Sequence, residues 1–119
     1  PDKIVDIEID EGSAQEQFDK AAAKDKYTAG GDVKLGKYTW KTLNFTWNKQ
    51  PSVVLYTDIT EGLHAEVTLY ETTLEDAAVN AFLEGVEFAT DYDVAHKAGM
   101  DTTVEKFVAD NNLKLWEAK

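Results

Sequence analysis

The sequence predicts an α+β domain in which an antiparallel β-meander is packed by two or three helices. Three observations lead to this class. Residues 4–10 alternate between apolar and acidic side chains, as a half-buried strand does. Residues 38–71 contain three strand-like runs that are separated by short turns. Residues 72–88 carry an apolar stripe with helical spacing.

The first strand and the first helix lie near the N-terminus. Val5, Ile7 and Ile9 share one face of the strand, and acidic residues alternate with them on the other face. Ser13 and Glu16 have the spacing of a capping box, so a helix is expected to begin at Ser13. Its apolar content is thin, which predicts a helix on the surface of the domain.

The first strand of the meander changes its apolar parity halfway along. Tyr38 and Trp40 occupy even positions, whereas Leu43, Phe45 and Trp47 occupy odd positions. A strand has a period of two, so either the strand bulges or the two aromatic sets face opposite sides of the sheet. We expect the odd set to be the better core candidates, which leaves the even set as a candidate recognition surface.

The other two meander strands have clearer patterns. Residues 52–59 are rich in β-branched side chains and poor in charge, which predicts a central strand. Residues 64–71 alternate, with Ala65, Val67 and Leu69 facing inward. We therefore expect a sheet of about four or five strands with helices against one face.

The C-terminal third is less regular. Residues 72–88 carry the strongest predicted helix, which is expected to end at Gly85, with a short strand expected over residues 86–88. Residues 89–119 are a C-terminal extension, in which a capped helix is expected over 102–112 and a strand or helix end over 113–116. No repeat and no long linker divides the chain, so we expect a single domain over residues 1–119.

The charge excludes several classes of function. The chain has 23 acidic and 12 basic residues for a net charge of -11, and every basic residue is Lys. Such a chain repels nucleic acid and anionic membranes, and it lacks the Arg clamp that phosphate ligands favour. It has no Cys, so disulfides and thiolate metal sites are excluded. No membrane span, no cofactor and no nucleic-acid partner is expected.

The candidate binding residues are aromatic side chains of the meander together with one histidine. Neighbouring strands place several rings close together, and exposed rings are good anchors for a partner. The alternative is that helices cover the sheet and that the rings fill the core. The candidates are Tyr38, Trp40, Tyr56, Tyr70 and His64.

Other chemistries find little support. Ser13 and Ser52 lie in no nucleophile elbow, so a catalytic triad with His64 or His96 is not expected. Asp91 and Asp93 are weak candidates for a surface calcium site, against the simpler interpretation of solvated loop carboxylates. Paired carboxylates for glycoside hydrolysis are not marked by any pattern.

The order of strand, helix, meander and helix over residues 4–88 resembles PsbP/Mog-like α+β domains, as found in secreted lipoproteins of Gram-positive bacteria. The segments that carry the resemblance are DIEID, GKYTWKTLNFTW, SVVLYTDI, HAEVTLYE and AVNAFLEGVEF. The N-terminal hairpin usual in that family has no counterpart in this sequence, and residues 89–119 extend past its usual end. The resemblance implies a scaffold or binding role more often than an enzyme.

We therefore expect a non-enzymatic, extracytoplasmic module of a bacterial cell-envelope protein that binds a protein or a small molecule. The sequence begins without Met, which we expect of a trimmed chain or of a mature secreted or lipid-anchored protein whose leader has been removed. One alternative is a small ligand carrier or enzyme with a pocket between sheet and helix, lined by Trp40, Trp47 and Phe82. Another is a structural domain that forms a homodimer through an edge strand.

Overall fold

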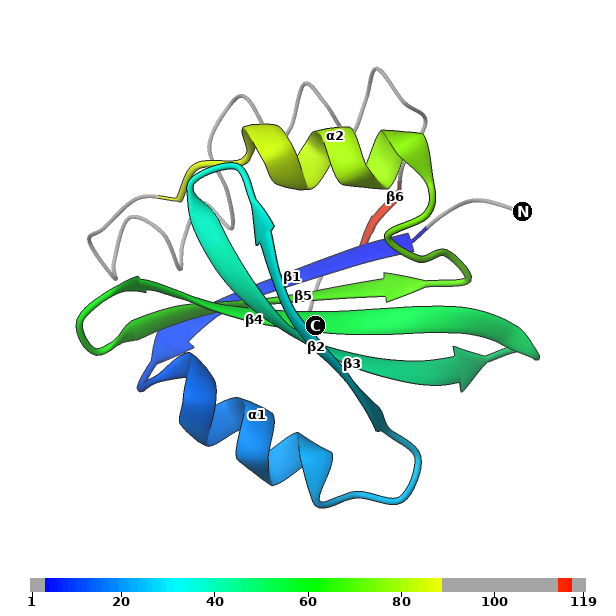
Figure 1. Cartoon of the computed structure of the whole chain (residues 1–119), viewed down its shortest axis with the longest axis horizontal. Helices are drawn as coiled ribbons and strands as arrows, with labels where there is room; N and C mark the ends of the chain where they lie inside the picture. Colours follow the sequence, from blue (N-terminus) through cyan, green and yellow to red (C-terminus); the bar gives the residue numbers. More distant parts are fainter. Residues whose placement is uncertain (1–3, 89–113, 117–119) are drawn as a thin grey trace.

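The computed structural model describes residues 4–88 and 114–116 of the 119-residue chain. The order of its elements confirms the predicted α+β class (Figure 1). The expected helix over 102–112 and the candidate ligands Asp91 and Asp93 lie outside the described residues. The elements are β1 (Ile4–Glu11), α1 (Ala14–Ala22), β2 (Thr28–Leu35), β3 (Tyr38–Trp47), β4 (Gln50–Thr60), β5 (Leu63–Tyr70), α2 (Ala77–Gly85) and β6 (Lys114–Trp116).

The sheet has the strand order β2-β3-β4-β5-β1-β6. Strands β2 to β5 follow one another as an antiparallel meander, which confirms the predicted meander and adds β2 at its edge. β1 pairs antiparallel with β5, on the far side of the meander from β2. β6 pairs parallel with β1, so residues 114–116 form a strand, one of the two alternatives expected there.

The helices α1 and α2 lie on opposite sides of the sheet (Figure 1). In the larger core, Val79, Phe82 and Leu83 of α2 meet apolar side chains from β1 to β5. In the smaller core, Ala14 and Ala21 of α1 meet side chains of β3 and β4. The expectation that the helices pack against one face is therefore wrong.

The central strands explain why both faces are covered. β4 presents Val53 and Leu55 to the α2 side, and it presents Val54 and Tyr56 to the α1 side. All four side chains are buried. A strand that is apolar on both faces has to be packed on both faces, because either face left in water would lose its hydrophobic stabilisation.

The helix starts follow the rules of N-capping. α1 begins where predicted, and the Ser13 hydroxyl accepts a hydrogen bond from the Glu16 N–H at 3.1 Å. α2 is shorter than the predicted segment, because Asp76 caps it by accepting a hydrogen bond from the Ala78 N–H at 2.9 Å. The four residues before Asp76 therefore form a loop that leads into the helix.

The chain after α2 is held by a side chain of the sheet. Val86 and Phe88 are buried, although the segment forms no strand. The Phe88 N–H donates a hydrogen bond to the Tyr38 hydroxyl at 2.9 Å, in a buried position. Tyr38 thus has a structural partner on the α2 side of the sheet.

The parity change in β3 is a true alternation between two faces. The pairing of β3 with β4 runs without a shift from Lys41 to Trp47, so no bulge lies at this point. Tyr38 and Trp40 therefore face α2, and they are 8% and 0% exposed. The expectation of a free recognition surface at these two rings is wrong, because α2 and the segment after it cover them. On the α1 side, Trp47 is 44% exposed.

Candidate functional site

A row of aromatic rings crosses the α1 side of the sheet and ends at the surface. Tyr27, Phe45, Tyr70 and Trp47 make successive edge-to-face contacts, with centroid separations of 5.5, 6.0 and 5.1 Å. The first three rings are half-buried. Trp47 is the one exposed large apolar side chain among the residues that the structure describes. We call these four residues the ring row.

The hairpin between β3 and β4 fixes the position of Trp47. Asn48 and Lys49 form its turn with φ values of 49° and 64°, as a two-residue type I′ turn requires. This turn keeps Trp47 in register with Gln50 at the end of the hairpin. The indole therefore lies over the sheet in contact with the Tyr70 ring, and its other side is exposed to solvent.

A row of polar side chains crosses the same face next to the ring row. Glu8 of β1 pairs in register with Glu66 of β5, and Glu66 pairs in register with Tyr56 of β4. Tyr56 in turn faces Lys41 of β3, and Lys41 faces Asp32 of β2. We call these five residues the polar row, because one member comes from each of the five long strands.

At one end of the polar row, the carboxyl groups of Glu8 and Glu66 lie opposite each other. Like charges directly opposite each other on a sheet repel, and a hydrogen bond between the two carboxyls removes that repulsion. The hydrogen bond with Glu66, followed by partial burial and by the negative charge of Glu66, raises the pKa of Glu8 to about 7. The pair therefore holds a proton at pH values where carboxyl groups are normally ionised.

This raised pKa gives the stability an unusual dependence on pH. A carboxyl that binds its proton more tightly in the folded state stabilises the fold only while it is protonated. The contribution is fully present below the ordinary pKa of 4.5 and is lost as the pH rises to about 7. Because Glu8 is exposed, solvent screening limits the loss to about 1 kcal/mol.

The middle of the polar row is buried. Tyr56 is 3% exposed, and the Phe18 ring of α1 packs edge-on against it at 6.3 Å. Burial, followed by a hydrogen bond with Glu66, raises the pKa of the Tyr56 hydroxyl. The Tyr56 hydroxyl is therefore neutral at physiological pH. It forms a hydrogen bond with Glu66, and its ring is not accessible to a partner.

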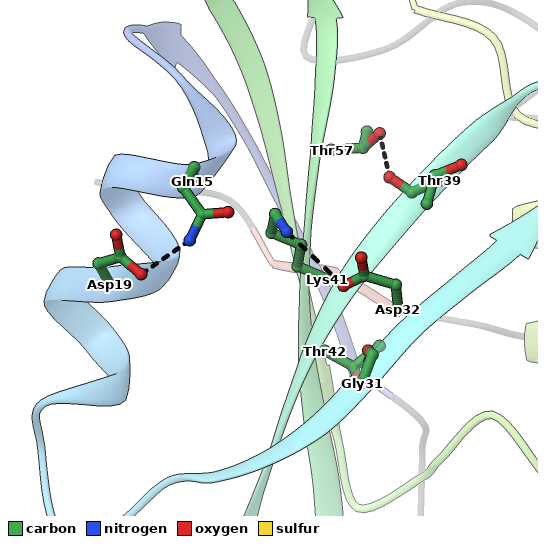
Figure 2. Close-up of polar contacts among 8 residues, drawn as sticks. All are labelled: Gln15, Asp19, Gly31, Asp32, Thr39, Lys41, Thr42 and Thr57. Carbon is green, nitrogen blue, oxygen red and sulfur yellow. Dashed lines mark hydrogen bonds and ion pairs between the residues drawn. The ribbon is translucent and has the colours of Figure 1, made fainter.

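The other end of the polar row is an ion pair. The Lys41 ammonium lies 3.7 Å from the Asp32 carboxylate, beside α1 (Figure 2). The same ammonium lies 5.8 Å from the centre of the Phe18 ring. The hydroxyl of Thr42, the next residue of β3, donates to the Gly31 carbonyl of β2 at 2.8 Å (Figure 2). These contacts hold β2 to β3 near the place where the register of β2 shifts.

Asp6 connects the polar row with the ring row. It lies on the same face of β1 as Glu8, two residues away, so the two carboxylates point the same way. Partial burial and the neighbouring Glu8 raise the pKa of Asp6. Burial, followed by the charge of Asp6, raises the pKa of the Tyr70 hydroxyl, which places this carboxylate near the ring row.

The candidate binding residues divide between the two faces. Tyr38 and Trp40 lie in the core on the α2 side. Tyr56, Tyr70 and His64 share the α1 side through the registers of β4 and β5. Of these three residues, Tyr56 and His64 are buried, whereas Tyr70, a member of the ring row, is half-buried.

His64 has a structural contact. It is 4% exposed, and its Nδ1 lies 3.0 Å from the Gly12 carbonyl oxygen in the turn before α1. The Asp58 carboxylate accepts a hydrogen bond from the Ala14 N–H at 2.9 Å in the same region. Both contacts fix the start of α1 against the sheet.

The two serines weighed for catalysis also have structural contacts. Ser13 is the helix cap described above. The Ser52 hydroxyl accepts a hydrogen bond from the Glu71 N–H at 2.9 Å and lies 3.3 Å from the Gln50 carbonyl oxygen. His96 lies outside the described residues.

The expected pocket lined by Trp40, Trp47 and Phe82 does not form. Trp40 and Phe82 belong to the core on the α2 side, whereas Trp47 lies on the opposite face. The cavities found are open surface hollows. One of about 710 Å³ lies on the outer side of α2 between Leu74 and Gly85, and another of about 400 Å³ lies beside Phe45.

Two features of this face were not predicted from the sequence. The exposure of Trp47 was missed because Leu43, Phe45 and Trp47 were expected to form the core beneath the helices. The Glu8–Glu66 pair was missed because its formation depends on the pairing of β1 with β5, strands separated by most of the described chain. The alternation of polar and apolar residues predicted which residues share a face of each strand, but it did not predict which residue of β1 lies opposite which residue of β5.

Comparisons with family models, with curated proteins and with solved structures returned no significant match. In the part of the chain that the structure describes, no helix is long and apolar enough to cross a membrane. Residues 4–88 and 114–116 also contain no group of three or more side chains positioned to hold a metal ion.

Proposed function

We propose that the chain is a non-enzymatic binding module that acts outside the cytoplasm as part of a bacterial cell-envelope protein. Support for the location comes from the resemblance of residues 4–88 to PsbP/Mog-like domains of secreted lipoproteins. Support for the binding role comes from the ring row. The observation that carries it is a Trp47 side chain that is 44% exposed and lies 5.1 Å from Tyr70.

An aromatic side chain held in this way is suited to anchor a partner. A free indole in water loses rotamer entropy when it binds, whereas an indole already packed against a second ring loses less. Trp and Tyr also combine a large apolar area with a polar group, which is why they dominate the binding energy of many interfaces. The ring row therefore offers a rigid contact area on an otherwise acidic protein.

The helix α1 defines the limits of this surface. It packs over Leu43, Val54 and Tyr56, which form the small core on this side. Trp47 and Glu8 share the same face and are exposed. The binding surface is thus the part of this sheet face that α1 leaves uncovered.

The oligomerising alternative receives less support. β2 forms one edge of the sheet, and most of its residues are exposed. It carries an irregular register between Ala29 and Gly31 and the charged residues Asp32 and Lys34. Bulges and charged side chains are the devices by which edge strands avoid pairing with other chains.

A peptide selection tests the proposal. Peptides displayed on phage would be selected against the immobilised full chain, and their affinities would be measured on Trp47→Ala and on a control, Leu74→Ala. Leu74 is a half-buried apolar residue that lines the cavity beside α2, so its variant also tests that rival site. We expect the selected peptides to lose about tenfold or more in affinity for Trp47→Ala and little for Leu74→Ala. Equal binding to Trp47→Ala would refute the proposal.

A further inference from the structure

Three carboxyl groups of this face, one exposed and two half-buried, lie in a regular array beside the ring row. Asp6 and Glu8 occupy alternate positions of β1, and Glu66 lies opposite Glu8 on β5. Alternate residues of a strand are about 7 Å apart and point to the same side. We call these three residues the acidic strip.

No described lysine forms an ion pair with a carboxyl group of the acidic strip. The two ion pairs between described side chains are Lys37–Glu87 and Lys41–Asp32, and neither includes a residue of the strip. The nearest internal compensation is the proton held between Glu8 and Glu66. Above about pH 7, where Glu8 ionises, the strip presents concentrated negative charge that no described lysine pairs with.

The lysines near the ring row lie at other places. Lys26 lies 5.0 Å from the centre of the Tyr27 ring, at the end of the row away from Trp47. Lys49 belongs to the hairpin turn after Trp47. Both lysines line the hollow beside Phe45, and neither belongs to β1 or β5.

We propose that the partner of this surface is an extended protein segment that carries lysine or arginine at alternate positions. Its cationic side chains lie on the acidic strip, and an apolar residue at one end contacts Trp47 and Tyr70. This inference rests on the proposed function and adds the chemical class of the partner. Charge complementarity selects that class, because a strip of carboxylates beside aromatic rings attracts cations through both groups.

The geometry favours an extended segment over a helix. Side chains at alternate positions of an extended chain repeat at about 7 Å, the same spacing as Asp6 and Glu8. Neighbouring side chains on one face of a helix are about 5–6 Å apart, which is shorter than the spacing between Asp6 and Glu8. The flexible aliphatic stems of lysine or arginine also cover apolar surface while their charged ends reach the carboxylates.

Titration with synthetic peptides tests the proposal on the full chain. The first peptide alternates lysine and threonine and ends in leucine, and the second has the same composition with its lysines adjacent. Both are acetylated and amidated, and binding is measured by calorimetry at low ionic strength. We expect the alternating peptide to bind about tenfold more tightly than the other, and we expect added salt to weaken it. Equal affinity of the two peptides would overturn the predicted spacing.

Charge-matched variants test the residues. Glu8→Gln/Glu66→Gln removes two carboxylates from the strip and retains side chains of the same size. Glu75→Gln/Glu87→Gln removes two exposed carboxylates near the ends of α2, on the other side of the sheet. The first variant is expected to weaken binding of the alternating peptide by about tenfold, and the control by less than about threefold. Equal loss in both variants would show non-specific attraction and overturn the proposal.

The failure of this inference differs from the failure of the proposed function. If peptides selected by phage display require Trp47 but lack lysine and arginine, the cationic class is wrong and the binding role stands. If neither synthetic peptide binds while selected peptides that require Trp47 but lack lysine and arginine do bind, the cationic class is again wrong and the binding role stands. If no selected peptide depends on Trp47, the proposed function itself fails.

Discussion

Replacing Tyr38 with Phe removes one oxygen atom and tests whether this residue is structural. In the folded protein the Tyr38 hydroxyl accepts a hydrogen bond from the Phe88 N–H at 2.9 Å, in a buried position. The Tyr38 ring also contacts the rings of Trp40 and Phe88 at 6.0 and 5.5 Å. Tyr38→Phe keeps these ring contacts and leaves the Phe88 N–H without its acceptor.

The cost follows from the burial of that donor. A buried N–H that loses its partner costs about 1–3 kcal/mol, more than the net value of the hydrogen bond in the intact protein. We therefore expect Tyr38→Phe to lower the free energy of unfolding by about 2 kcal/mol. For a chain of 119 residues the melting temperature then falls by about 8 °C.

Thermal and urea unfolding followed by circular dichroism measure this difference. Tyr27→Phe is the matched control, because Tyr27 is half-buried on the α1 side and its hydroxyl has no hydrogen bond among the described residues. We expect the control to change the free energy of unfolding by less than about 0.5 kcal/mol. If Tyr38→Phe is as stable as this control, Phe88 is not held by Tyr38, and the cover over the α2 side is assigned wrongly.

Three further predictions concern other parts of the fold. Glu8→Gln should raise the free energy of unfolding by about 1 kcal/mol at pH 8 and leave it unchanged at pH 4, because the proton shared with its neighbour is lost only at the higher pH; urea unfolding at both pH values measures this. A Glu8→Gln variant that gains stability at pH 4 but not at pH 8 would refute the shared proton. Gly36→Ala should destabilise the fold by about 2 kcal/mol or more, because φ is +64° and a Cβ would collide with the last turn of α2; thermal unfolding measures it, and a change below about 0.5 kcal/mol would contradict that close approach. In a Trp116→Phe background, acrylamide should quench the emission of Trp47, and the further change Trp47→Phe should leave the blue-shifted, unquenched emission of Trp40; quenching that persists would contradict the burial of Trp40.

Local structure was predictable from the sequence where a single short-range pattern, such as strand alternation or a helix cap, determines it. The inward faces of β1 and β5 follow from strict alternation, and Val5, Ile9 and Val67 are buried as predicted. The start of α1 follows from the capping pair of Ser13 and Glu16. In each case neighbours in the sequence decide the outcome, so no long-range pairing has to be known.

The candidate site was less predictable, because it depends on relations between distant segments. The parity change in β3 was recognised, but its consequence depended on whether one or both faces are covered. If helices cover only one face of the sheet, only one of the two sets can be buried. The set of Leu43, Phe45 and Trp47 was then preferred as core over the set that contains Trp40. With both faces covered, Trp40 and Leu43 are each 0% exposed, and exposure is decided by position along the strand.

Unequal cover of the two faces explains why the ring row reaches the surface. α1 has nine residues, so it spans about 14 Å, whereas the eleven residues of β4 span about 36 Å. α2 has the same length as α1, but Leu74 before it and Val86 and Phe88 after it extend the cover on its side.

On the other side, α1 follows the turn at Gly12 directly, and after it Tyr27 packs on Phe45 without reaching Trp47. The exposed ring is thus a consequence of how the fold is built, since a short helix cannot cover a long hairpin. A variant that lengthened the cover over Trp47 would stabilise this face and close the proposed binding surface. Stability and binding therefore make opposite demands on the α1 side, as surfaces kept open for a partner commonly do.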